Sequence, residues 1–407
     1  MSAVDLERDF RLLAEDPAIR TVNADLRPGS RPGEASLALS IYPQERHDLY
    51  VSVANDRSPS VGGERVSIGG HARNGVVAGD ILTGGIGLTK GVADAAVGYA
   101  APFFDPRTTI SARVGFNNAA VIDRPVRPLD IRARERSGEI RLTHKFIDEP
   151  LLPGAQAGRW APARTFSGGV LLARRVSTSL LQGEPFSFAA GSVDGRAAYT
   201  AVRLVGDYLV RGVDQVFAVS VTATKGLAGT RSDAAGALNP KRHFSVALAQ
   251  VNYARRLSDK GLELRARLAG QIADSILYSG ERFSAGGATS VRGYRENLLL
   301  ADEGIMGSLE LAQPISFSRR QVGAAGFDWG AFSVSAFVDA ASLKNRNAPQ
   351  PDGPIYSVGA SLAWTPSEAL SAQLTYGESL SPEPPVAEQD IQDDGVHFRM
   401  TFRPLRW

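Results

Sequence analysis

Side chains that could carry enzyme chemistry are present in this chain, but their spacing builds no recognisable site. The chain has no cysteine for a thiolate nucleophile or a metal ligand, and no G-x-S-x-G sequence for a nucleophilic serine. The glycines of "TGGIG" (83–87) lack the G-K-[ST] that completes a phosphate-binding loop. The histidines lack the H-x-x-x-H and H-E-x-x-H spacings of zinc sites; they are His47, His71, His144, His243 and His397. We therefore predict no enzymatic activity, no metal site and no cofactor.

A stretch of a different kind lies at residues 286–296, "GGATSVRGYRE", between two runs that are typical of β-strands. A simple turn would be short and polar, whereas this stretch ends in arginine and aromatic residues. Gly293 could adopt a backbone conformation barred to other residues, and Tyr294 could pack its ring while its hydroxyl finds a partner. Such residues can anchor a loop. On the residues alone, an exposed surface loop is the simpler interpretation.

The elements that must position this stretch are short strands with one apolar and one polar face. "LELRARLAGQ" (262–271), "AFSVSAFVD" (331–339) and "GVHFRMTF" (395–402) each alternate apolar with polar residues. In the second of these, Asp339 falls on the polar face with Ser333 and Ser335. A soluble sheet and a membrane barrel both produce this alternation, because the apolar face can cover a core or meet lipid.

The number of strands favours the barrel. Candidate strands start near residues 48, 64, 79, 91, 108, 134, 162, 196, 212, 242, 260, 304, 330, 354, 368 and 394, about sixteen in all. An even number is required of bacterial outer-membrane barrels, and closure removes the exposed edges of a sheet. A soluble sheet of this length would normally divide into domains with linkers. We therefore predict an all-β fold, a 16-stranded antiparallel transmembrane β-barrel, with a soluble sandwich or propeller as the alternative.

Composition excludes some partners. The 45 basic and 43 acidic residues nearly cancel, with a net charge of +2, which argues against a nucleic-acid surface. The sequence has no window of about 18 apolar residues, so it predicts no transmembrane helix. The opening "MSAVDLERDF" is charged and lacks the apolar core of a signal peptide.

The two ends of the chain carry further signals. Leu6, Phe10 and Leu13 recur at helical spacing before Pro17, and a hairpin pattern follows to about residue 45. At the other end, the chain finishes on Trp407, an aromatic residue that could close the last strand of a barrel. Pro404 interrupts the alternation before it, so we expect Pro404 at a strand end or a bulge.

With the barrel predicted, "ERFSAGGATSVRGYRENLL" resembles the signature loop of two-partner secretion transporters, the haemolysin-activator and filamentous-haemagglutinin-transporter family. The matching residues are Val291, Arg292, Gly293 and Tyr294. Members of this family have sixteen strands, and the signature lies in the sixth surface-side loop, which folds back into the pore. In our strand count the stretch joins strands 11 and 12, which is the sixth surface-side loop. Strand count and motif position therefore agree.

The resemblance also implies a partner for the loop arginine. Family members carry an F-x-D element on a later strand whose carboxylate faces the lumen and pairs with that arginine. The corresponding residues in "SAFVDAASL" are Phe337 and Asp339. The resemblance thus predicts that Arg292 and Asp339 meet inside the barrel, where they would anchor or gate the loop.

The first 45 residues resemble the C-terminal half of the POTRA domain next to the barrel, so the resemblance predicts a partial α+β POTRA domain at 1–45 and the barrel at 46–407. A signal peptide, a plug helix, a first POTRA domain and half of the second are not found in the sequence given. We expect the start to be truncated or misassigned, or the gene to be degraded.

The function implied by the resemblance is secretion. The chain would be a protein translocase of the Gram-negative outer membrane, moving an unfolded haemolysin-like or adhesin-like exoprotein from the periplasm to the surface. The other expected partners are outer-membrane lipid and lipopolysaccharide, and the barrel assembly machinery during biogenesis. The protein is expected to be a monomer and to bind no nucleic acid. An insertase for other barrels and a passive channel are the alternatives.

Overall fold

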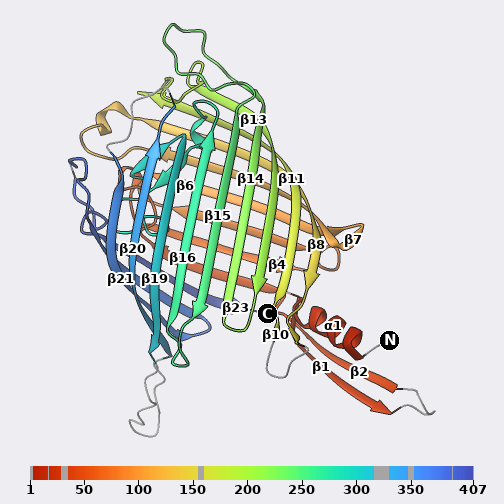
Figure 1. The fold of residues 1–407 in the computed structure, drawn as a ribbon. Helices are drawn as coiled ribbons and strands as arrows, with labels where there is room; N and C mark the ends of the chain where they lie inside the picture. The colour runs from red at the N-terminus through yellow and green to blue at the C-terminus, as the bar shows by residue number, and fades with distance from the viewer. Residues whose placement is uncertain are drawn as a thin grey trace.

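The computed structural model describes residues 3–16, 18–28, 35–154, 160–315, 330–346, 353–386 and 388–406, and its main feature is a closed antiparallel barrel (Figure 1). The long strands of the barrel are β3 (His47–Ala54), β4 (Arg65–Arg73), β5 (Ile81–Leu88), β6 (Val92–Phe103), β7 (Asp105–Ala120), β8 (Arg132–Glu149), β11 (Ala163–Leu181), β13 (Arg196–Arg211), β14 (Gln215–Gly229), β15 (Ser245–Arg256), β16 (Glu263–Ala273), β19 (Glu303–Ile315), β20 (Ala331–Lys344), β21 (Ile355–Ser367), β22 (Leu370–Ser379) and β23 (Val396–Arg406).

These sixteen strands confirm the predicted fold class. Among the described residues, the closed sheet contains one further strand, the two-residue β12 (Glu184–Pro185), and β11 also pairs directly with β13 beside it. Each predicted strand start lies within three residues of an observed one. The sheet closes where the last strand, β23, pairs with the first, β3. We call this pairing the seam.

The two faces of each strand differ as the alternation predicted. On β19 and β20, Leu309 and Val338 are about half exposed on the outside of the barrel. Their neighbours Ser308 and Asp339 are buried on the inside. Apolar side chains thus form the outer face of the wall, and polar side chains line the lumen. This is the arrangement of a barrel that stands in lipid.

The two ends of the barrel carry connections of different length. At the end nearest the N-terminal helix, short connections such as residues 212–214 and 257–262 join the strands. The opposite end carries longer loops, among them 182–195, 230–244, 274–302 and 380–395, and a short helical turn in each of three loops: η1 (Pro59–Val61), η2 (Arg127–Leu129) and η3 (Ser279–Glu281). We call these the helix end and the loop end. In outer-membrane barrels in general, the periplasmic turns are short and the surface loops are longer.

The N-terminal unit lies beside the helix end (Figure 1). It contains helix α1 (Ala3–Ala14) and the hairpin of β1 (Ile19–Pro28) and β2 (Ala35–Pro43). Arg211 of the barrel donates to Glu15 at 2.6 Å, and the Arg11 guanidinium lies 5.2 Å from the centre of the Trp160 ring. Trp160 belongs to a small hairpin of β9 (Leu152–Pro153) and β10 (Trp160–Ala161). The predicted helix and hairpin are therefore present, whereas Pro17 lies outside the described residues.

The last strand contains the expected irregularity. The pairing of β23 with β3 shifts between Phe402 and Leu405, where one extra residue on β23 forms a bulge around Pro404. Because a bulge changes the side-chain phase, Leu405 returns to the outer face and is half exposed. Trp407 lies outside the described residues. No helix in the described part of the chain is long and apolar enough to cross a membrane.

The orientation of the two faces can be tested on one strand. In the middle of β14, Val221 lies on the outer face and its neighbour Thr222 faces the lumen. Val221→Arg should destabilise the barrel in a bilayer by about 2–4 kcal/mol, because a cation is costly near the membrane midplane. Thr222→Arg is the matched control and should cost much less. Urea unfolding in lipid vesicles measures both values, and equal losses would contradict the assignment of faces.

Candidate functional site

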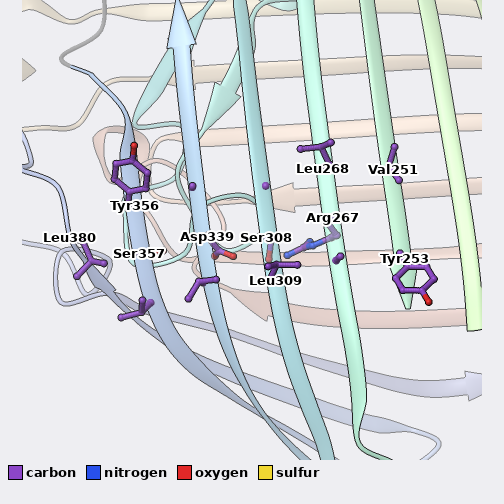
Figure 2. A pocket seen from close by; sticks show the side chains of 15 residues that line it. Val251, Tyr253, Arg267, Leu268, Ser308, Leu309, Asp339, Tyr356, Ser357 and Leu380 are labelled. Atoms are coloured by element: carbon purple, nitrogen blue, oxygen red, sulfur yellow. The ribbon is translucent and has the colours of Figure 1, made fainter. Parts of the chain in front are cut away.

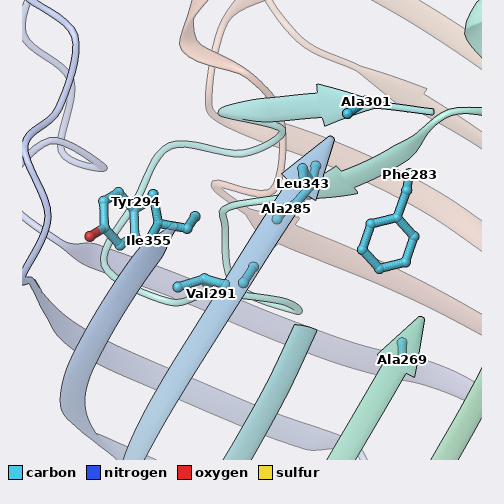
Figure 3. Packing of buried hydrophobic residues seen from close by; sticks show 9 residues of the cluster. Ala269, Phe283, Ala285, Val291, Tyr294, Ala301, Leu343 and Ile355 are labelled. Carbon is cyan, nitrogen blue, oxygen red and sulfur yellow. The ribbon is translucent and has the colours of Figure 1, made fainter. Parts of the chain in front are cut away.

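The candidate site is built by the connection between β16 and β19, residues 274–302, which we call the inner loop. Its short strands β17 (Phe283–Ala285) and β18 (Leu299–Ala301) pair with each other inside the barrel. Phe283, Val291 and Tyr294 are buried against wall residues that include Ala269, Ala341, Leu343 and Ile355 (Figure 3). The loop therefore packs against the lumen side of the wall and does not extend away from the loop end.

Glycines shape the tip of the inner loop. Gly286 and Gly287 have φ values of +105° and +104°, a region that other residues rarely adopt. The Gly287 N–H donates to the Val291 carbonyl at 3.1 Å, and the Ser290 N–H donates back to the Gly287 carbonyl at 3.2 Å. This tight turn places the next residue, Arg292, against the barrel wall.

Arg292 is the centre of the site. Its Nε donates to Asp339 Oδ2 at 2.8 Å and its Nη2 to Asp339 Oδ1 at 2.9 Å. This is the bidentate geometry of a strong arginine–carboxylate pair. The Arg292 backbone N–H also donates to Asp339. Nη1 donates to Glu310 at 2.5 Å and Nη2 to Ser308 at 3.0 Å. The side chain of Arg292 is only 4% exposed and that of Asp339 is fully buried.

The partners of Arg292 are arranged by the register of two neighbouring strands. Ser308 on β19 lies directly opposite Asp339 on β20, and Glu310 lies opposite Phe337. These four side chains share the lumen face, and the Arg292 guanidinium lies over them, 3.4 Å from the centre of the Phe337 ring. The arrangement combines two carboxylates, a hydroxyl and an aromatic face, which together satisfy a buried guanidinium.

The charge on Arg292 is stabilised by this environment. Burial alone would lower the pKa of the guanidinium, but the hydrogen bonds and negative charges of Asp339 and Glu310 outweigh burial and raise the pKa. The site therefore holds one buried cation against two carboxylates. Removing one partner of a buried pair typically costs about 3–5 kcal/mol, because the other charge remains buried.

The backbone of Gly293 lies directly against the wall. Its φ is +92°, and a Cβ at this position would lie 2.6 Å from the carbonyl oxygen of Gly377 on β22. A Cβ on Gly377 would in turn lie 2.7 Å from the Gly293 nitrogen. Only glycine satisfies both the conformation and the space at position 293.

Val291 and Tyr294 complete the contact of the signature residues with the wall. Both side chains are fully buried. The Tyr294 hydroxyl donates to the backbone carbonyl of Tyr356 at 2.7 Å and accepts the Ser381 N–H at 3.0 Å. Tyr294 thus joins the inner loop to β21 and to the connection that follows β22.

The connection between β22 and β23, residues 380–395, forms a second contact, and we call it the closing loop. Arg295 pairs with Asp393, with Nη2 at 2.6 Å from Oδ2, and donates to the backbone carbonyl of Glu388. The Glu296 N–H donates to Gln392 Oε1 at 2.9 Å. The Gln392 amide nitrogen donates to the carbonyls of Asn55 and Arg57, which follow β3.

Through Gln392 the inner loop is therefore connected to the seam. The side chain of Asn55 spans the seam itself. Its Nδ2 donates to the Val396 carbonyl and its Oδ1 accepts the Phe398 N–H, both at 2.7 Å. Burial raises the pKa of the Glu296 carboxyl, and its hydrogen bond from the Ala288 N–H only partly offsets this effect. A buried carboxyl at this joint makes the contact sensitive to pH.

The root of the inner loop is held by a third contact. Glu281 accepts hydrogen bonds from Tyr199 at 2.7 Å and from Arg203 at 2.5 Å, both on β13. Arg175 on β11 donates to the Gly280 carbonyl at 3.0 Å. Leu277 and Tyr278 pack nearby against Phe244 and other lumen-facing residues. The loop is thus attached to the wall at both its root and its tip.

Polar space remains beside the tip. A cavity of about 410 Å³ lies between the loop and the wall, lined among others by Arg265, Arg267, Asn252 and Gln373 together with Arg292 and Glu310. Behind this wall, the outer face is apolar: Figure 2 shows Leu268, Leu309 and Tyr356 around a hollow on the outside of the strands that carry Ser308 and Asp339. No cluster of acidic or histidine residues suited to a metal occurs within the described ranges.

The structure thus brings together most of the residues singled out from the sequence. Arg292, Phe337 and Asp339 meet directly, and Val291, Gly293 and Tyr294 pack around them. Sequence reasoning missed Glu310, although its position on the polar face of the strand directly after the loop was a usable signal. It also missed Glu281, Gln392 and Asp393, which lie in connections where no alternation marks a lumen-facing residue.

Comparison with known proteins supports the family resemblance. Residues 194–342, which include the inner loop, Glu310 and Asp339, match the model of a family described as haemolysin secretion/activation protein ShlB/FhaC/HecB. No curated protein matches the chain by sequence. The resemblance to two-partner secretion transporters inferred from the signature residues is therefore confirmed by a family model that covers those residues.

Solved structures share the fold at low sequence identity. CdiB from Escherichia coli has a TM-score of 0.75 and 19% identity, over 99% of this chain and 71% of that chain. CdiB from Acinetobacter baumannii has a TM-score of 0.69 and 16% identity, over 95% of this chain and 66% of that chain. BamA from Haemophilus ducreyi lacking POTRA domains 1-3 has a TM-score of 0.59 and 14% identity, over 99% of this chain and 78% of that chain. These similarities show the fold.

The contact at Gly293 predicts that a single methyl group releases the loop tip. Gly293→Ala should increase the open fraction of the barrel in planar bilayers, because the Cβ would collide with Gly377 and the backbone would be strained. Gly236→Ala is a matched control, since Gly236 also has a positive φ, +76°, but faces open space. Equal conductance of Gly293→Ala and wild type would contradict the close contact.

The raised pKa of Glu296 predicts a pH dependence with a defined sign. A carboxyl that is harder to ionise in the docked loop binds its proton more tightly there, so docking weakens as pH rises through the raised pKa. The Asp56, Arg57 and Arg399 charges near Glu296 are retained in a Glu296→Gln variant. The open fraction of the barrel, measured in planar bilayers, should rise between about pH 5 and about pH 8. This rise should be steeper in wild type than in Glu296→Gln. Identical slopes would show that Glu296 does not control docking.

Proposed function

We propose that this chain, which resembles the two-partner secretion transporters in its signature loop and in its fold, is an outer-membrane translocase for an unfolded partner protein. The barrel would stand in the outer membrane of a Gram-negative bacterium, with its loop end at the cell surface. The client would enter from the periplasm, at the helix end. The observation that carries the proposal is the docking of the signature loop inside the barrel by Arg292, between Asp339 and Glu310.

The docked loop supports a gated pore over a permanently open channel. Its tip and root are attached to different parts of the wall, β19 to β22 on one side and β11 to β13 on the other. In the proposed mechanism, a polypeptide passes when the tip moves away from the wall. The polar lumen supplies replacement hydrogen bonds to an extended chain, and the cavity beside Arg267 and Asn252 offers space at the tip.

The roles of the individual residues follow from their contacts. Arg292 and Asp339 would hold the gate, Phe337 would support the guanidinium, and Gly293 would allow the close approach to β22. Val291 and Tyr294 would anchor the backbone on either side of Arg292. None of these residues is proposed to take part in bond making or breaking.

The N-terminal unit would receive the client. We propose that residues 1–45 are the C-terminal half of a POTRA domain. The apolar row Leu37, Leu39 and Ile41 of β2 is exposed, as expected of a sheet whose covering elements belong to the rest of such a domain. An extended client could then add a strand to the edge of this sheet.

A charge reversal tests the gate. Arg292→Glu should abolish most secretion of the partner protein and increase ion conductance, because three carboxylates would then repel one another at the tip. The double variant Arg292→Glu, Asp339→Arg should partly restore both, since the pair is re-formed with reversed sign. Secretion is measured as the fraction of partner protein in the medium, and conductance in planar bilayers.

The control for this reversal is an exposed lumen pair. Arg141 lies 3.5 Å from Asp207 with both side chains at least one third exposed, so Arg141→Glu should change secretion little. Normal secretion by Arg292→Glu would contradict the proposed gate. Unchanged secretion with reduced assembly of other outer-membrane barrels would instead identify the chain as an insertase.

A further inference from the structure

A cluster of arginines lies on the outside of the barrel, away from the lumen site. On β8 the outward row that contains Ile140 and Leu142 continues toward the loop end with Arg136, Arg134 and Arg132. All three arginines are exposed. A membrane barrel rarely places cations on its lipid-facing rows unless they lie at the membrane surface. The row therefore changes from apolar to basic as it approaches the surface side.

Neighbouring strands extend the cluster. The register places Thr178 of β11 between Arg134 of β8 and Arg196 of β13. Arg174 of β11 lies opposite Gly138 and is thus a diagonal neighbour of Arg136. Neighbouring strands are about 4.8 Å apart and a strand rises about 3.3 Å per residue, so these four arginines cover an area roughly 10 Å across the strands and about 13 Å along them. We call them the arginine patch.

The arginine patch has no acidic partners of its own. Arg132 pairs with Asp130 at 2.9 Å. Arg134, Arg136, Arg174 and Arg196 form no ion pair with any residue in the described ranges, and Arg174 donates only to the Thr200 hydroxyl, at 3.0 Å. Glu135 and Glu139 lie on the alternate row of β8, which faces the lumen. Asp194 lies two residues before Arg196 and forms no ion pair with the patch within the described ranges. Four such positive charges close together on the outer wall favour an external anion.

The height of the patch matches the boundary of a membrane. From Arg136 to Phe146, the outward row of β8 runs ten residues, and with the usual strand tilt this corresponds to about 25 Å across the bilayer. Phe146 contacts Phe166 and His144 at the opposite boundary, as in an aromatic girdle. The apolar band therefore has the height of the hydrocarbon core, and Arg136 lies at the level of the outer headgroups.

An apolar groove lies on the adjoining strands. Its volume is about 790 Å³, and Leu204 and Ile272, both strongly exposed, form its sides above the small residues Ala223 and Ala247. Lys225 lies at its loop end and donates to Ser245 at 2.8 Å. Asp274 and the ion pair of Glu303 with Arg346 line the groove as well. An acyl chain would fit along this groove with its polar end at Lys225.

We propose that the arginine patch and this groove bind a phosphorylated, multiply acylated glycolipid of the outer leaflet, the lipopolysaccharide type of lipid. Phosphate groups would be held by the planar guanidinium groups, which bind phosphate through paired hydrogen bonds. The acyl chains would lie against the apolar band below. The proposal depends on the barrel standing in an outer membrane and not on secretion, so the two can fail separately.

The wall around β15 to β21 provides an internal comparison. It carries an outer hollow of about 620 Å³ that is also apolar (Figure 2). The charged residues that line it, Arg267 and Asp339, belong to lumen-facing rows, where Arg267 donates to Thr289 of the inner loop. Among the described lining residues, this hollow has no outward cation at its loop end. It would accept acyl chains but not a phosphorylated headgroup.

The test is lipid binding by the purified full chain in detergent, measured by native mass spectrometry with diphosphoryl lipid A, monophosphoryl lipid A and phosphatidylglycerol as probes. Wild type should prefer the diphosphorylated lipid. The variant Arg134→Gln, Arg136→Gln, Arg174→Gln should bind it at least about tenfold more weakly, since several charge-assisted hydrogen bonds are lost.

A matched control removes the same number of charges at the helix end: Arg107→Gln, Arg164→Gln, Arg255→Gln. This variant should bind diphosphoryl lipid A like wild type. Heat-modified mobility on gels confirms that both variants fold. Equal binding by the patch variant and wild type would overturn the proposal. Displacement of the lipid by millimolar inorganic phosphate would also overturn it, because it would show that the acyl chains contribute nothing.

Discussion

The buried guanidinium of Arg292 is the interaction on which the arrangement of the lumen depends. A charged side chain that is removed from water must recover its hydration energy from the protein, and a single carboxylate rarely suffices. Here Asp339 accepts two bonds from the side chain, Glu310 accepts a third and Ser308 a fourth. The loop backbone, the register of β19 with β20 and the glycines near β22 all serve to bring this one group to its partners.

The register of the wall is therefore part of the site. Because Ser308 faces Asp339 and Glu310 faces Phe337, a slip of one residue between β19 and β20 would turn one of these sets to the lipid side. The exposed residues Leu309 and Val338 oppose such a slip, since they would enter the polar lumen. The hydrophobic effect on the outside of the barrel thus fixes the geometry of the charges on the inside.

Much of this could be inferred from sequence, and the reason lies in periodicity. Alternation along each strand identified the polar face on which Asp339 lies, and the strand count placed the inner loop. The pairing of Arg292 with Asp339 could not be obtained from alternation, because the two residues are far apart in sequence, and it came from the resemblance to a family. Gln392 and Asp393 were not predicted because loops have no repeating pattern. Their role depends on the contact between the closing loop and the inner loop, which no sequence pattern indicates.

The balance of forces at the loop tip determines how it can move. If the contacts were independent, the loop would loosen gradually as each was lost. In a buried cluster, however, loss of one partner leaves a charge uncompensated at a cost of about 3–5 kcal/mol. Partial release is therefore the least stable arrangement, and the contacts of Arg292 should form and break together.

The contacts with the closing loop act in the same direction. Tyr294, Arg295 and Glu296 follow Gly293 and bind β21 and the closing loop. Movement of the tip therefore also disturbs Gln392 and its bonds beside the seam. The root can remain in place, because Glu281 and Tyr278 have separate partners on β13 and in the connection after β14. The structure thus favours a two-state swing of the tip about a fixed root, in which opening of the lumen and loosening of the seam are coupled.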